Sequence, residues 1–110
     1  MSPDERQYVD GVFAAFTALP LTTGRLSPAD RRLASALYRD DVPLDVVRSA
    51  LTIGLLRRLL SLGSSRARSA PVRSLSYFLG VVRELQACPP DPGYITHVRS
   101  ALERSMARVD

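Results

Sequence analysis

The residues of this sequence best suited to chemistry are arginines, and six of them occupy an interval without any acidic residue. No aspartate or glutamate lies between Asp45 and Glu84, and the arginines from position 48 to position 73 of that interval are Arg48, Arg57, Arg58, Arg66, Arg68 and Arg73. The first three belong to a helical pattern, whereas the next two stand in a Gly/Ser-rich segment. A helix end rich in guanidinium groups, next to such a segment, can follow a phosphate backbone without reading bases.

We therefore expect a nucleic-acid-binding surface formed by Arg57, Arg58, Arg66, Arg68 and Arg73. The alternative is an ordinary solvated surface, on which the arginine stems cover apolar area. No aromatic residue is interleaved with the arginines of segment 63–71, so stacking of single-stranded bases is less expected there. The formal net charge of +4 would be unremarkable if spread evenly, so the local density of arginine carries the prediction.

Residue types found in catalytic and metal sites are isolated in this sequence. His97 is the only histidine and has no cysteine or acid at ligand or triad spacing, so we expect it at the surface. Cys88 stands beside two prolines without a local histidine, and the pair Asp40-Asp41 is typical of a turn. No Gly-rich phosphate loop, paired catalytic carboxylates or zinc spacing occurs. We expect a protein that is not an enzyme and has no catalytic residue, metal or cofactor.

Capping signals predict where helices begin. Ser2-Pro3-Asp4-Glu5 and Ser27-Pro28-Ala29-Asp30 each place a hydroxyl before a proline and an acid in the first turn, and Asp91-Pro92 repeats the pattern with a carboxylate. Together with apolar residues at helical spacing, these signals predict helices over 3–18, 28–39, 43 to about 62, 74–87 and 92–109. The sequence predicts an all-α bundle of about five helices, forming one domain over residues 1–110.

Length and composition agree with a small globular domain. The chain has 110 residues, of which 45% are hydrophobic and 24% charged, which argues against disorder. One unpaired cysteine suits a reducing compartment, and the acidic start lacks the pattern of a signal peptide. Arginines interrupt the longest apolar stretch, 44–62, which is therefore a poor membrane span. We expect a cytoplasmic bacterial protein that does not enter a membrane.

The third helical pattern changes its apolar side at Gly54. Before the glycine, one side carries Val46, Val47, Ala50, Leu51 and Ile53; after it, Leu55, Leu56, Leu59 and Leu60 lie on the side that was polar. A straight helix on a single core cannot satisfy both halves. We expect a long central helix that bends near Gly54 or packs its halves on opposite neighbours. We also expect Val47, Leu51, Phe78 and Val82 to be buried.

Two other features bear on function. The chain has the spacing of a helix-turn-helix over residues 28–39, a turn and residues 43–62. Acids at Asp40, Asp41 and Asp45 would repel phosphates, so an ordinary helical hairpin is the favoured interpretation. The leucine face formed by Leu55, Leu56, Leu59 and Leu60 would be a partner interface if it were exposed. A protein–protein adaptor or homodimer using this face is therefore the alternative function.

The stretches Asp41–Leu51 and Arg73–Val82 resemble a recurrent pattern in bacterial and phage replication-initiation proteins, including the DnaD-like group. In that pattern, a helix that opens with a turn residue and an aliphatic run is followed by a loop and a helix with a tyrosine-centred apolar motif. The resemblance covers about 26–85, and Leu85-Gln86 stands where the family usually has an aromatic residue. It implies a non-enzymatic helical module that binds DNA or replisome partners, in replication or near mobile elements.

Overall fold

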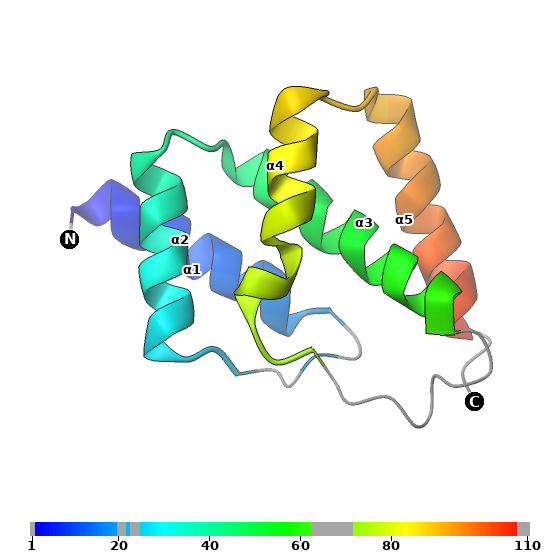
Figure 1. Ribbon diagram of the computed structural model, residues 1–110, viewed down its shortest axis with the longest axis horizontal. Coiled ribbons are helices and arrows are strands. Elements are labelled where there is room, and N and C mark those ends of the chain that lie inside the picture. Colours follow the sequence, from blue (N-terminus) through cyan, green and yellow to red (C-terminus); the bar gives the residue numbers. More distant parts are fainter. Residues whose placement is uncertain (1, 20–21, 23–24, 63–71, 108–110) are drawn as a thin grey trace.

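The structure, a computed structural model, describes residues 2–19, 22, 25–62 and 72–107. Within these ranges there are five α-helices and a one-turn 3₁₀ helix, namely α1 (Pro3–Thr17), α2 (Pro28–Arg39), α3 (Leu44–Leu62), η2 (Leu75–Phe78), α4 (Leu79–Ala87) and α5 (Pro92–Ala107) (Figure 1). No strand occurs in these ranges, although Thr22 and Val72 form an isolated bridge. The prediction of an all-α bundle of about five helices is confirmed. None of the described helices has the length and apolar character needed to span a membrane.

The predicted caps hold the starts of α1 and α2. The Ser2 hydroxyl accepts a hydrogen bond from the Glu5 amide at 3.1 Å, with Pro3 in the first helical position. At α2, the Ser27 hydroxyl accepts from the Asp30 amide at 3.2 Å, and Asp30 Oδ2 accepts from the Ser27 amide at 2.9 Å. This reciprocal pair is a capping box, which satisfies backbone donors that no helical carbonyl can reach.

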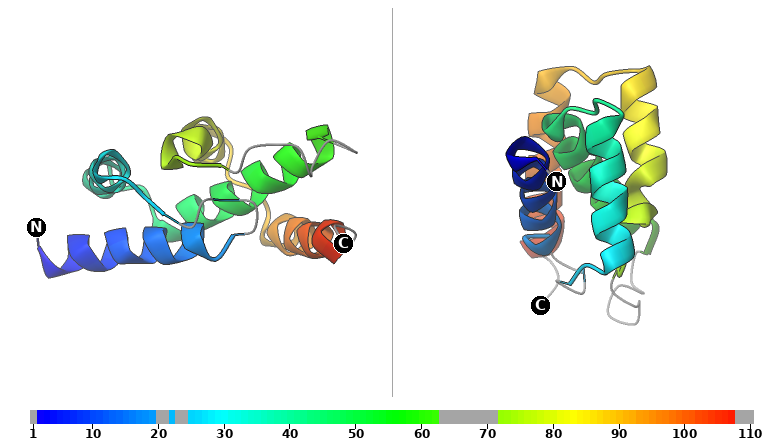
Figure 2. Two further views of the ribbon diagram at one scale, coloured as in Figure 1. Left: turned by 90° about the horizontal axis from the view of Figure 1, so that it is seen from below. Right: turned by 90° about the vertical axis from the view of Figure 1, so that its left-hand side faces the viewer.

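Helix α3 lies at the centre of the molecule. Figure 2 shows α2 and α4 on one side of it and α1 and α5 on the other. Contacts join α3 to α1, α4, α5 and η2, whereas α2 packs on α1 and η2. Because α3 has neighbours on several sides, it buries residues on more than one side. These are Val47, Ala50, Leu51, Ile53, Leu55 and Leu59.

This central position explains the change of apolar side at Gly54. Helix α3 is continuous from Leu44 to Leu62, so the helix does not break there, and its halves bury different sides instead. A Cβ atom built on Gly54 would lie 2.6 Å from Cδ1 of Phe78, which is itself fully buried. The glycine is therefore a point of close approach between α3 and η2. The other predicted core residues, Val47, Leu51 and Val82, are also buried.

The turn between α2 and α3 ends α2 with a Schellman motif. The Val42 amide donates to the Leu37 carbonyl at 3.1 Å and the Asp41 amide to the Tyr38 carbonyl at 3.1 Å. Asp41 takes the left-handed conformation (φ 58°), which aspartate tolerates better than most residues. Val42 and Leu37 are both buried, as this motif favours. The acidic pair Asp40-Asp41 thus serves the turn, and the main contacts of α2 are not with α3.

Candidate nucleic-acid interface

Arg57 leaves α3 toward α4 and is engaged there by a carboxylate. Its two terminal nitrogens donate to the two oxygens of Glu84, Nη1 at 2.8 Å and Nη2 at 2.7 Å. The hydrogen bond from Arg57 lowers the pKa of Glu84, and the same bond raises the pKa of Arg57 above its ordinary value. Both side chains are about half exposed, at 50% and 51%. A phosphate would have to compete with Glu84 for this guanidinium.

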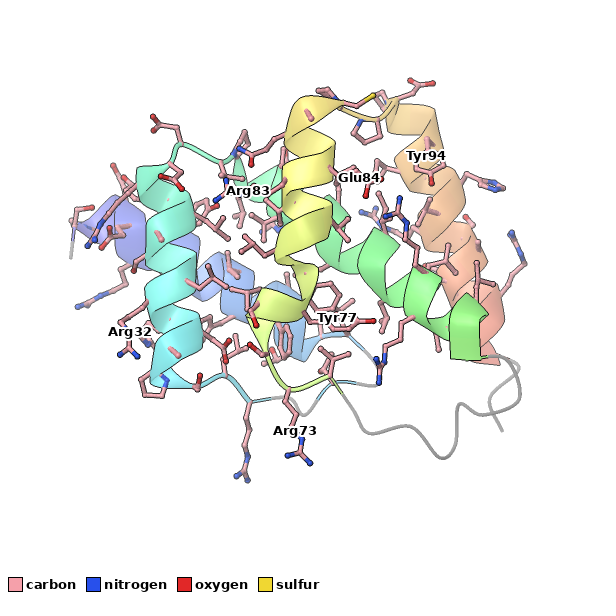
Figure 3. The ribbon with its side chains drawn as sticks, in the orientation of Figure 1. Arg32, Arg73, Tyr77, Arg83, Glu84 and Tyr94 are labelled. Carbon is pink, nitrogen blue, oxygen red and sulfur yellow. The ribbon has the colours of Figure 1, made fainter. Side chains whose placement is uncertain are left out.

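Arg58, the next residue, points to a different neighbour. Its guanidinium carbon lies 5.3 Å from the centre of the Tyr77 ring, and Nη1 donates to the Tyr77 hydroxyl at 3.4 Å. Such a cation–π arrangement holds an arginine side chain in place while leaving its charge intact. Tyr77 itself is 48% exposed (Figure 3). Arg58 and Tyr77 therefore form a stacked pair at the surface where η2 meets α3.

The exposure of Tyr77 differs from the sequence-based expectation. The helical pattern over 74–87 groups Tyr77 with the apolar residues Leu75 and Phe78, although positions 75 and 77 are about 200° apart around an α-helix. The first turn is instead the 3₁₀ helix η2, in which residues three apart lie in line. Leu75 and Phe78 are accordingly buried, and Tyr77 turns outward. Helix η2 packs against α2, α3 and α4, and these contacts are not visible in the sequence pattern.

Arg73 is exposed and belongs to a segment that Asp30 holds in place. Oδ1 of Asp30 accepts hydrogen bonds from the Ser74 hydroxyl at 2.9 Å and from the Leu75 amide at 2.9 Å. Oδ2 of the same carboxylate accepts from the amide and hydroxyl of Ser27, each at 2.9 Å. Burial raises the pKa of Asp30, but these hydrogen bonds outweigh it and lower the pKa below its ordinary value of 3.8. Asp30 thus ties the start of α2 to the start of η2.

The remaining arginines of the predicted surface, Arg66 and Arg68, lie outside the described residues. In sequence they stand between the end of α3 at Leu62 and the segment that carries Arg73. One arginine that the sequence analysis left out, Arg32 of α2, is exposed on the face that also presents Arg73 and Tyr77 (Figure 3). The position of Arg32 in the sequence does not indicate that it lies near Arg73 and Tyr77, because only the fold brings α2 next to η2.

The predicted leucine face is only partly exposed. Leu55 and Leu59 are fully buried, so the expectation that they would meet a partner is wrong for these two residues. The reason is the central position of α3, which is covered by neighbours on both layers. Leu56 is partly buried against the core, and Leu60 remains 64% exposed.

The other residues considered for chemistry lie at the surface. His97 and Cys88 are exposed, and Asp40 forms a surface ion pair with Arg83 at 3.6 Å. Within the described ranges, no three His, Cys, Asp or Glu side chains lie close enough together to hold a metal ion. Comparison of the chain with protein families, with curated proteins and with solved structures found no match.

Proposed function

We propose that this protein is a non-enzymatic nucleic-acid-binding module that contacts the phosphate backbone through Arg58, Arg73 and the intervening Arg66 and Arg68. The observation that carries the proposal is the position of Arg58 and Arg73, the described arginines on either side of segment 63–71. Arg58 stacks on Tyr77 of η2, and the exposed Arg73 stands four residues before that tyrosine. Arginine interacts with phosphate through a planar fork of donors and keeps its charge at all relevant pH values.

The acids near this surface do little to offset its charge. The carboxylate of Asp30 lies under the surface, is 3% exposed as a residue, and has both oxygens engaged in hydrogen bonds. Glu84 forms an ion pair with Arg57. Arg57 is therefore not among the primary phosphate contacts. Arg32 adds a further positive charge on the same face. The surface therefore suits a polyanion better than the acidic turn at Asp40-Asp41 does.

DNA is the first ligand to test. The resemblance of Asp41–Leu51 and Arg73–Val82 to replication-initiation modules supports an accessory role in DNA replication or in mobile elements. The experiment measures binding to a mixed-sequence duplex over a series of salt concentrations. Four phosphate contacts would give a log–log salt slope of about −3 to −4. The variant Arg66→Ala/Arg68→Ala should flatten the slope by up to about two units and weaken all duplexes alike.

The matched control loses the same charge elsewhere. Arg6→Ala/Arg104→Ala removes two exposed arginines of α1 and α5, on the other side of α3. This control should keep the slope of the unmodified protein. If it flattens the slope as much as the first variant does, net charge and not this surface is responsible. Absence of salt-dependent binding at low ionic strength would refute the proposed function.

A protein–protein adaptor or homodimer is the second candidate, and the exposure of Leu60 favours it. A leucine that is 64% exposed beside the partly buried Leu56 is a small apolar patch of the kind found at interfaces. Sizing of the protein over a range of concentrations tests self-association. Loss of a dimer in a Leu60→Glu variant would support this candidate, whereas a monomer at all concentrations would exclude the homodimer.

A further inference from the structure

A groove unrelated to the arginine surface is lined by residues of α3, α4 and α5 and of the connection between α4 and α5. Figure 1 shows how these elements are arranged. Its volume is about 490 Å³, within the roughly 300–1,000 Å³ of ligand-binding pockets. Three aliphatic side chains from three helices line it, Val46 of α3, Leu85 of α4 and Ile95 of α5. Each belongs to the core or packs against it, so the apolar lining rests on a rigid base.

Two arginines give the groove a positive rim. Arg48 of α3 and Arg99 of α5 both line it, and both are exposed. The one acid in the lining, Asp45, lies 3.7 Å from Arg48, and its side chain is 94% exposed. A surface pair of that length contributes little and does not prevent Arg48 from meeting another carboxylate. The first turn of α3, with Asp45 and Val46, adds the positive end of a helix dipole.

The third part of the lining restricts how a partner can bind. Pro89, Pro90 and Pro92 form the connection between α4 and α5 and line the groove. Proline has no N–H group, so this connection offers few donors to an extended strand that would bind through its main chain. A partner would therefore be recognised through its side chains, as an amphipathic helix is when it lies in an apolar groove.

We propose that this groove docks an acidic amphipathic helix of a protein partner. Apolar side chains of the partner helix would enter between Val46, Leu85 and Ile95, and flanking glutamates or aspartates would pair with Arg48 and Arg99. Charge complementarity selects this occupant, because a basic helix would meet both arginines and the helix dipole with the wrong sign. The proposal does not depend on nucleic-acid binding, since none of the arginines assigned to that function lines the groove.

The test titrates isotope-labelled full-length protein with two synthetic helical peptides. The acidic probe carries leucines at positions i, i+3, i+4 and i+7 and glutamates elsewhere, and the second probe has lysines in place of the glutamates. We expect the acidic probe to bind more tightly and to shift the amide resonances of Val46, Leu85 and Ile95. Its binding should weaken as salt is added.

Charge reversal makes the test specific. In the variant Arg48→Glu/Arg99→Glu, affinity for the acidic probe should fall about tenfold or more, and affinity for the lysine probe should rise above that of the unmodified protein. The variant Arg6→Glu/Arg104→Glu has the same change of net charge away from the groove and should prefer the acidic probe as before. If charge reversal at the groove impairs folding, Ile95→Asp, which places one negative charge in the lining, should likewise weaken the acidic probe.

Three outcomes would overturn the proposal. The two probes could bind with equal affinity, the shifted resonances could lie outside the groove, or the preference could survive charge reversal. Competition between a DNA duplex and the acidic probe for Arg48 and Arg99 would also overturn it, because the groove would then belong to a nucleic-acid surface. The first three results would leave the salt slope that tests the proposed function unchanged, whereas DNA contacts at Arg48 and Arg99 would steepen it.

Discussion

Asp30 is the residue whose surroundings differ most from those of a surface acid. A buried carboxylate is unfavourable unless donors satisfy it, and Asp30 receives four hydrogen bonds on its side chain. The bonds join two segments that are more than forty residues apart in sequence, since they run to Ser27 on one side and to Ser74 and Leu75 on the other. The local half of this network follows from the capping motif, whereas the distant half requires the fold.

Stability should therefore depend on Asp30 at neutral pH and lose that contribution in acid. The folded pKa of Asp30 lies below its ordinary value of 3.8, so folding favours the ionised form. Its contribution is fully present above the ordinary pKa and is lost as pH falls through the lower folded pKa. We expect Asp30→Asn to lower the free energy of unfolding by about 1–3 kcal/mol at neutral pH. Urea unfolding at several pH values should show this difference shrinking in acid.

The control for this prediction is Asp10→Asn, which changes an exposed aspartate of α1 and should alter stability little at any pH. A constant difference between the Asp30→Asn variant and the unmodified protein across the acid range would contradict the role given to the ionised carboxylate.

Glu84 is expected to limit the participation of Arg57 in phosphate binding. Its two oxygens occupy both terminal nitrogens of the guanidinium at 2.7 and 2.8 Å. The variant Glu84→Gln removes the carboxylate and should leave Arg57 able to contact phosphate. One added contact should steepen the log–log salt slope on duplex DNA by about 0.9. The variant Glu103→Gln, an equal charge change on an exposed site of α5, should leave the slope unchanged.

At the scale of elements, Gly54 and Gly80 occupy helices for different reasons. A Cβ atom at Gly54 would meet the buried ring of Phe78 at 2.6 Å, whereas a Cβ atom at Gly80 in α4 would meet nothing within 4 Å. Alanine gains roughly 1 kcal/mol over glycine inside a helix, and an overpacked core loses about 1–3 kcal/mol. Of these two glycines, only Gly54 is a site where the two effects oppose each other.

We expect the same substitution to have opposite results at these two sites. Gly54→Ala should reduce the free energy of unfolding by about 1–2 kcal/mol, because the ring of Phe78 cannot move aside without displacing core neighbours. Gly80→Ala should increase it by about 0.5–1 kcal/mol. Urea unfolding of both variants provides the measurement. Stabilisation by Gly54→Ala would show that α3 and η2 approach less closely than the structure describes.

The sequence predicted the helices best, because the caps and apolar spacing that indicate a helix are local. Caps at Ser2 and Ser27, the apolar spacing of each helix and the change of side at Gly54 all involve residues within one or two turns. The leucines after Gly54 were harder to place, since a pattern of two apolar sides does not say which side is covered. Leu59 is buried and Leu60 exposed because of where α1, α4 and α5 lie around α3.

At the scale of the whole molecule, the candidate interface was predictable only in part. The acid-free interval is visible in the sequence, but the pairing of Arg57 with Glu84 and of Arg58 with Tyr77 depends on contacts between α3 and the η2–α4 segment. These partners are 19 to 27 residues apart. The groove at the α4–α5 connection was not predicted for the same reason, as its lining comes from three helices.

Phe78 joins the layers of the molecule, and its truncation should weaken the fold as a whole. The ring is fully buried, lies 6.1 Å from the ring of Phe16 in α1, and closes on Gly54 of α3. Removing so large a core side chain leaves a cavity between three elements, so Phe78→Ala should lower the free energy of unfolding by about 3–5 kcal/mol.

The neighbouring Tyr77→Ala is the matched control, because this ring is 48% exposed and contributes less to the core. Urea unfolding is followed by far-ultraviolet circular dichroism and by aromatic absorbance. In each variant the two probes should report the same transition, and its midpoint should shift far more for Phe78→Ala than for Tyr77→Ala. Equal shifts would mean that η2 does not connect α1 to α3 through this ring.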